Sequence, residues 1–130
     1  MMHDHPGQLA YIQIDTADPE RLAGFWAALF GVEIGERIGE SPAGPRYVVL
    51  QPQDGGQVAF SFQWVPEEKQ AKNRVHVDVA ATQGLEEVTD LVEQQGGTRV
   101  RDGDFSEHGW RWRVMNDPEG NEFCLLPVDP

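Results

Sequence analysis

The sequence has little that would support a disulfide framework, export or membrane insertion. Its 130 residues include one cysteine, Cys124, which excludes an intrachain disulfide and agrees with a reducing compartment. No apolar run approaches the roughly 20 residues of a membrane helix, and the N-terminus lacks the basic and apolar regions of an export signal. We therefore expect a cytoplasmic protein with no membrane partner.

Basic residues are also scarce. Lys and Arg number 10 against 22 Asp and Glu, which gives a formal net charge of −12. A protein that binds nucleic acid needs clustered basic side chains to replace phosphate counterions, so we expect no nucleic-acid partner. The hydrophobic content of 39% is sufficient for one domain with its own core.

What the sequence does contain is an internal repeat. Ile12-Gln13-Ile14-Asp15 returns as Val75-His76-Val77-Asp78, and each copy is followed by a helix signal and further strand patterns. Repetition of one supersecondary unit indicates two similar halves. We predict a single domain over residues 1–130, with one unit at about 9–65, a connector at 66–73 and a second unit at about 74–127.

Hydrophobic periodicity predicts one helix and four strands in the first unit. Asp18 and Pro19 are typical of a helix start. Apolar side chains, Trp26 among them, then recur at helical spacing until Gly31, which places Trp26 in the core. Alternation predicts the strands at residues 9–15, 32–38, 46–51 and 57–64. The predicted order is βαβββ.

The second unit repeats this order. A helix is predicted from about Gly84 to Gln95, closed by Gly96 and Gly97. Residues 102–108 are predicted as a loop, and strands are predicted at 74–79, 98–101, 110–116 and 121–126. The sequence therefore predicts an α+β fold in which two βαβββ repeats form a curved mixed sheet around a central cavity.

Side chains alternate along a strand, so one face of each sheet should pack on its helix while the other stays open. We predict that the helix-facing side chains are Val58, Phe60, Phe62, Val75 and Val77. For the last hairpin, a four-residue loop at 117–120 places Asn116 opposite Asn121. This register turns Trp112 and Val114 toward the helix, and it places Arg111, Arg113, Glu122 and Cys124 together on the open face.

The polar residues of the open faces form the predicted ligand-binding site. Its members are Tyr11, Gln13, Ser61, Gln63, Arg74, His76, Arg111, Arg113, Glu122 and Cys124. His76 has three interpretations: a metal ligand, a general base or a hydrogen-bonded sheet residue. The two strand arginines either clamp a carboxylate or phosphate or pair with nearby acids. Cys124 is either a packed residue or, beside Arg113, a thiol of lowered pKa.

The repeat resembles the vicinal oxygen chelate superfamily, which includes glyoxalase I, extradiol dioxygenases, fosfomycin-resistance enzymes and bleomycin-binding proteins. Residues 17–31 resemble the family's first helix and residues 117–126 its closing hairpin. Residues 62–69 and 72–79 resemble the glyoxalase-like branch. The resemblance covers nearly the whole chain, and it implies a small-molecule ligand and, as in many members, a homodimer.

For metal-using members, the resemblance implies a His or Gln from the first strand of each unit and a carboxylate from the last strand. His76 matches this pattern, and Gln13 matches if the internal repeat is followed, although counting back from Asp18 selects Tyr11. The carboxylate positions carry Gln63 and Cys124 instead, with Glu122 as a nearby substitute. Such a site suits Mg²⁺ or Mn²⁺ poorly and is incomplete for Zn²⁺. We therefore expect no cofactor, with a divalent metal at His76 and Gln13 as the alternative.

The leading functional prediction is a glyoxalase- or bleomycin-resistance-like protein that binds a small molecule without a complete metal site. Whether it is an enzyme stays open. The alternatives are a metal-dependent isomerase, lyase or dioxygenase of the same superfamily, and a protein-interaction module. The net charge permits a cationic ligand, although an acidic solvated surface also accounts for it, whereas the two strand arginines favour an anion. We expect the arginines to decide, because distant charge is screened over about 8 Å.

Overall fold

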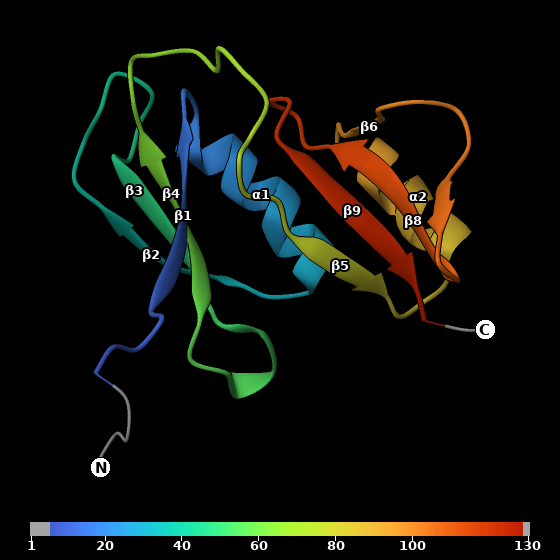
Figure 1. Cartoon of the computed structure of the whole chain (residues 1–130). Coiled ribbons are helices and arrows are strands. Elements are labelled where there is room, and N and C mark those ends of the chain that lie inside the picture. Colours follow the sequence, from blue (N-terminus) through green and yellow to red (C-terminus); the bar gives the residue numbers. More distant parts are fainter. Residues whose placement is uncertain (1–5, 129–130) are drawn as a thin grey trace. The chain divides into compact units, whose positions relative to one another are not determined.

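The computed structural model describes residues 6–128, and the chain divides into two compact units, Met1–Pro66 and Glu67–Pro130. The first contains β1 (Tyr11–Thr16), α1 (Pro19–Phe30), β2 (Ile34–Ile38), β3 (Tyr47–Leu50), a short 3-10 helix (Gln53–Gly55) and β4 (Ala59–Trp64). The second contains β5 (Asp78–Ala81), α2 (Leu85–Gln94), β6 (Thr98–Arg99), β7 (Phe105–Glu107), β8 (Trp110–Asn116) and β9 (Glu122–Pro127) (Figure 1). The predicted α+β fold with βαβββ units is confirmed.

Helix α1 begins and ends where the sequence predicts. The Asp18 carboxylate accepts a hydrogen bond of 3.2 Å from the backbone N–H of Arg21, and Pro19 is the first helical residue. Gly31 follows the helix with φ of 67°, a left-handed conformation that glycine adopts without steric cost. Local capping chemistry therefore fixes both ends of α1.

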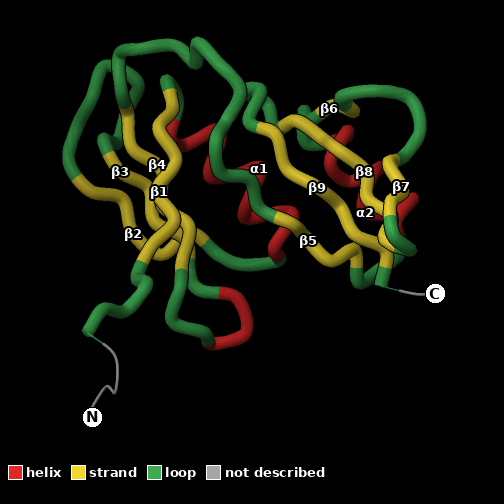
Figure 2. Tube along the Cα trace, in the orientation of Figure 1, coloured by secondary structure: helices red, strands yellow, loops and turns green. Residues whose placement is uncertain are grey.

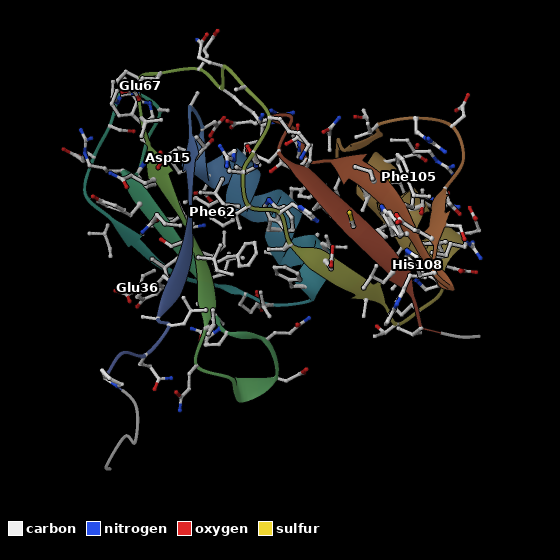
Figure 3. All side chains as sticks on the ribbon, in the orientation of Figure 1. Asp15, Glu36, Phe62, Glu67, Phe105 and His108 are labelled. Carbon is white, nitrogen blue, oxygen red and sulfur yellow. The ribbon has the colours of Figure 1, made fainter. Side chains whose placement is uncertain are left out.

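The first sheet has the strand order β1-β4-β3-β2, in which β1 and β4 are parallel and the other pairs antiparallel. Phe60 lies opposite Ile12, and its ring centroid is 5.1 Å from that of Trp26 and 4.9 Å from that of Phe30. Phe60 and Phe62 thus face α1 as predicted, and Trp26 is a core residue with 1% exposure. Figure 3 labels Phe62 within this unit.

The second sheet has the order β5-β9-β8-β6, and β7 also pairs with β8. Figure 2 shows β7 beside β8, joined to β6 by a loop. The prediction of a loop throughout residues 102–108 is therefore wrong, because Phe105, Ser106 and Glu107 form an antiparallel pairing with β8. Helix α2 lies behind β8 and β9 in the view of Figure 1 and contacts β9.

Strand β5 starts later than the sequence predicts. The expected strand at 74–79 is observed only from Asp78, and Val75 is 78% exposed, so its predicted helix-facing position is wrong. The chain before β5 is held instead by a side chain, because Glu122 Oε1 accepts a hydrogen bond of 3.1 Å from the backbone N–H of Asn73. In the first unit, Val58 precedes β4 and is 36% exposed.

The last hairpin has a different register from the predicted one. The backbone N–H of Asp117 donates to the carbonyl of Asn121, which leaves a three-residue loop at 118–120, and Gly120 adopts φ of 83°. A turn followed by a left-handed glycine is typical of three-residue hairpin loops. Asn116 consequently pairs with Glu122, and this one-residue shift turns every side chain of β8 to the other face.

None of the helices within residues 6–128 has the length and apolar character needed to cross a membrane.

Candidate functional site

The open face of the second sheet is defined by pairings that involve Cys124. Asp78 of β5 and Val114 of β8 both pair with Cys124 of β9, so these three side chains lie side by side on the face opposite the one that carries Phe123 and Leu125. The latter two residues are buried in the core. The open face therefore presents Asp78, Cys124 and Val114 next to one another.

His76, Asp78 and Cys124 form a cluster on this face. His76 Nε2 lies 3.5 Å from Asp78 Oδ1, and the two side chains are 47% and 52% exposed. One potential ligand atom from each of the three residues lies within 4.8 Å of the others. Strand alternation in the sequence already predicts that Asp78 shares a face with His76, although Asp78 is not among the ligand-binding residues named from the sequence. The pairing of Asp78 with Cys124 follows only from the observed register of β5 and β9.

Cys124 is buried, with 6% exposure. Burial, followed by the charge of Asp78, raises the pKa of the Cys124 thiol to about 11. The prediction of a thiol of lowered pKa beside Arg113 is wrong, because Arg113 pairs with Leu125 and lies on the other face. At neutral pH the side chain is a protonated thiol in the absence of a bound cation.

The predicted placement of Arg111 and Arg113 on the open face is also wrong. Arg113 Nε donates to Asp104 Oδ1 at 2.7 Å, and its two terminal nitrogens donate to the Glu86 carboxylate of α2 at 3.3 and 3.0 Å. Arg113 Nη1 also donates to Thr89 Oγ1 at 2.8 Å. Arg111 Nε donates to Asp104 Oδ2 at 3.0 Å. The guanidinium of Arg113 is thus enclosed between the sheet and α2, with 4% exposure of the residue.

The charged groups of this ion-pair network shift one another's pKa values. The hydrogen bond from Arg113 lowers the pKa of Asp104 against the opposing effect of burial, and it also lowers the pKa of Glu86. The hydrogen bond to Asp104 in turn raises the pKa of Arg113. All three groups are therefore charged at neutral pH, and the network ties α2 to β8.

The predicted face of Trp112 is wrong for the same reason. It was predicted to face α2, but the observed register places it on the open face, where its ring stacks on Phe105 with centroids 5.7 Å apart and planes 9° apart. Figure 3 labels Phe105 of β7 and His108, which directly follows β7. Trp112 is half-buried, and it provides an aromatic surface on the same face as Cys124.

Glu122 shares the open face but is held by other groups. Besides the backbone N–H of Asn73, its carboxylate lies 3.7 Å from Lys69 Nζ. Burial favours the neutral acid, but the hydrogen bond from Asn73 and the nearby Lys69 prevail and lower the pKa of Glu122. Glu122 thus anchors the connector to the sheet. Arg74, another predicted site residue, is exposed and precedes β5.

The first unit brings its four predicted site residues onto one face. Tyr11 pairs with Ala59, Gln13 with Ser61 and Asp15 with Gln63, so the predicted face assignment in β1 and β4 is confirmed. A cavity of about 240 Å³ at the start of these strands is lined by Ala10, Tyr11, Gly35, Glu36, Val49, Leu50, Gln51, Pro52, Gln57 and Ala59. Of the predicted site residues, Tyr11 contributes to it.

The donor chemistry of the second unit's cluster fits a particular class of metal ion. Imidazole, carboxylate and thiolate ligands are those of Zn²⁺ and Co²⁺ sites, whereas Mg²⁺ and Mn²⁺ prefer oxygen ligands. His76 and Gln13, the predicted pair, lie in different units. His3 and His5, a further HxH pair in the sequence, lie outside the described residues.

Comparison with solved structures shows the fold of the chain. An enzyme of the glyoxalase/bleomycin resistance protein/dioxygenase family from Burkholderia phytofirmans PsJN is 21% identical, with a TM-score of 0.74 over 95% of this chain and 100% of that one. The fosfomycin resistance protein FosX from Listeria monocytogenes is 12% identical, with a TM-score of 0.70 over 96% of each chain. TioX from Micromonospora sp. ML1 is 17% identical, with a TM-score of 0.60 over 93% and 98%.

None of the curated proteins compared with the chain matches it. A family model described as "Glyoxalase-like domain" matches residues 11–126, which includes both units from β1 into β9. The match agrees with the solved structures, whose likeness shows the vicinal oxygen chelate fold. By its sequence and its fold, the chain belongs to the glyoxalase-like domain family.

Proposed function

We propose that this protein binds a small polar molecule on the open face of the β5-β9-β8 sheet, with His76 and Asp78 as the main contacts. The observation that carries the proposal is the separation of polar groups between the two faces. Arg111 and Arg113 are engaged by carboxylates on the helix side, whereas His76 and Asp78 remain about half exposed on the open side.

The register also changes the expected ligand. The sequence interpretation favoured an anion because it placed two arginines on the open face. With these arginines on the other side, the open face offers an imidazole, the Asp78 carboxylate and an aromatic ring. Ligands with hydrogen-bond donors or a positive charge directed at Asp78 therefore suit it better than carboxylates or phosphonates.

The proposal is testable by nuclear magnetic resonance. Isotope-labelled protein is titrated with fragments that carry amine, hydroxyl, carboxylate or phosphonate groups, and amide shifts are followed. We expect amine and hydroxyl fragments to perturb residues around His76, Asp78 and Cys124, and Asp78→Asn to abolish these shifts. His108→Asn is the matched control, since its imidazole is exposed on another segment. Binding confined to other surfaces, or no binding at millimolar concentration, contradicts the proposal.

A second candidate is a metal-dependent enzyme, and the cluster of His76, Asp78 and Cys124 favours it. A bound divalent ion polarises substrate oxygens as a Lewis acid, and in this chain His76 belongs both to the predicted pair with Gln13 and to this cluster. Elemental analysis of tag-free protein purified without chelator tests this candidate. We expect near-stoichiometric metal that is lost in His76→Ala; metal-free protein that takes up no ion on soaking contradicts it.

A further inference from the structure

The second unit contains three chemically different side chains that could bind one metal ion, without any contribution from the first unit. We propose that it alone holds a soft divalent ion of the zinc class, with His76, Asp78 and Cys124 as the protein ligands. This inference deepens the second candidate function and rests on it. It differs from the arrangement that the family resemblance implies, in which each of the two repeats supplies ligands.

The spacing of the cluster supports the assignment. Ligand atoms bound to one tetrahedral zinc ion at 2.0–2.3 Å are separated from each other by about 3.5 Å. His76 Nε2 and Asp78 Oδ1 are already 3.5 Å apart, and all three ligand atoms lie within 4.8 Å of one another. Because the His76 and Asp78 side chains are about half exposed, small rotations of these side chains close the remaining distance to the Cys124 sulfur.

The backbone fixes two of the ligands relative to each other. Asp78 and Cys124 are paired residues on adjacent parallel strands, and the backbone N–H of Cys124 donates to the Val77 carbonyl at 3.0 Å. His76 precedes β5, and the 3.5 Å distance from its Nε2 to Asp78 Oδ1 places it beside these two residues. A metal site built on paired strands is better ordered than one built on loops.

The chemistry of the ligands selects the ion. Cys124 binds an ion as its thiolate, so metal uptake releases the thiol proton to solvent. A thiolate with an imidazole and one carboxylate suits Zn²⁺, Co²⁺ and Cd²⁺ and disfavours Mg²⁺ and Mn²⁺. Three protein ligands leave one tetrahedral position for water or substrate, as in catalytic zinc sites. Glu122 is not required, since Asn73 and Lys69 already engage its carboxylate.

Cobalt spectroscopy of the full chain tests the assignment directly. The tag-free protein carries His3→Ala and His5→Ala, which removes the N-terminal HxH pair, and it is titrated with Co²⁺ and then with competing Zn²⁺. We expect a thiolate-to-cobalt charge-transfer band and the intense visible bands of four-coordinate cobalt, both displaced by Zn²⁺ and unaffected by excess Mg²⁺. Cys124→Ser abolishes the charge-transfer band, and Asp78→Asn and His76→Ala each weaken binding more than about 100-fold.

Two control variants make the outcome decisive. Gln13→Ala removes the first-unit ligand that the family arrangement would require, and His108→Asn removes an unrelated exposed imidazole. We expect both to bind Co²⁺ like the parent protein. Loss of binding in Gln13→Ala overturns the single-unit site in favour of a two-unit one. Binding that persists in Cys124→Ser, or that never produces a thiolate band, also overturns the inference while leaving metal dependence intact.

Complete absence of Co²⁺ and Zn²⁺ binding rejects both this inference and the metal-dependent candidate, and it leaves fragment binding as a separate question. Folding of each variant is checked by circular dichroism and thermal unfolding. Because Cys124 is buried, Cys124→Ala provides a second variant of similar volume that lacks the sulfur and the hydroxyl. Loss of the cobalt band in a folded Cys124→Ala protein gives the same answer as Cys124→Ser.

Discussion

The two units share the βαβββ order, with the short strand β7 added in the second, but they join helix to sheet with different chemistry. In the first, α1 packs through aromatic rings, with Trp26 and Phe30 against Phe60 of β4. In the second, α2 is tied to β8 by charges, with Glu86 and Thr89 around Arg113. The same βαβββ topology therefore places the helix against its sheet in both units, while the interactions that hold it there are aromatic in one unit and ionic in the other.

This difference has an energetic consequence. Burial of aromatic rings involves no titratable group, so it does not depend directly on pH, and each buried large side chain contributes about 1.5–3 kcal/mol. A buried ion pair has a large desolvation cost that only complete pairing offsets. We therefore expect the first unit to be sensitive to lost volume and the second to be sensitive to lost charge.

The largest effect is expected from Trp26→Ala. Removing this buried ring leaves a cavity against Phe60 and should lower the free energy of unfolding by about 4 kcal/mol, as measured by denaturant titration. Trp110→Ala is the control, because Trp110 is 70% exposed; we expect it to change stability by less than about 0.5 kcal/mol. Equal effects of the two substitutions would contradict the aromatic core of the first unit.

Asp104→Asn should have the next largest effect. It removes the carboxylate that receives hydrogen bonds from both Arg111 and Arg113, and loss of one partner from a buried ion pair costs about 3 kcal/mol. Hydrogen exchange should show faster opening of amides in β8 than in β3. Asp102→Asn, an exposed neighbour, should leave exchange unchanged. A stability loss confined to the first unit would refute the comparison.

The same network predicts a distinct response to acid. The pKa values of Asp104 and Glu86 are lowered in the folded protein, so their stabilisation is fully present above the unfolded-state values of about 4. It is lost as pH falls through the lowered folded values. Asp104→Asn should therefore flatten the decline of stability below about pH 4, which acid titration of hydrogen exchange would detect; an unchanged slope would argue against the network.

The smallest effects are expected from substitutions of the glycines at positions 24 and 31, in α1 and directly after it. Gly24 is an exposed position inside the helix with no atom within 4 Å of an added Cβ, so Gly24→Ala should stabilise the first unit by about 0.5–1 kcal/mol. Gly31→Ala should destabilise it by about 1–2 kcal/mol, because φ is 67° there. Thermal unfolding resolves both changes, and stabilisation by Gly31→Ala would contradict the capping assignment.

The sequence predicts the fold well because its signals are local. Asp18, Pro19 and Gly31 determine the ends of α1 through hydrogen bonding and backbone conformation within a few residues. Strand alternation likewise assigns Phe60 and Gln13 to the correct faces. By contrast, β7 is a short strand whose existence depends on pairing with β8, a partner that local patterns do not reveal.

The candidate site is predicted less completely because it depends on register. Cys124 follows from alternation within its own strand and His76 from its place just before β5, but the positions of Arg111 and Arg113 depend on the length of a loop several residues away. Val75 shows the same limitation: its β-propensity is high, yet no neighbouring strand pairs with it in the described structure. Pairing across strands, which is non-local, decides all these cases.

The three-residue loop that ends at Gly120 determines which face of the sheet each side chain of β8 occupies. With this loop, Arg113 pairs with Glu86 of α2, and Trp112 lies on the open face. A loop that is one residue longer would shift the register of β8 by one position. Arg111 and Arg113 would then share a face with Cys124, and Trp112 would face α2. The length of this loop therefore decides whether the arginines or the tryptophan of β8 share a face with Cys124.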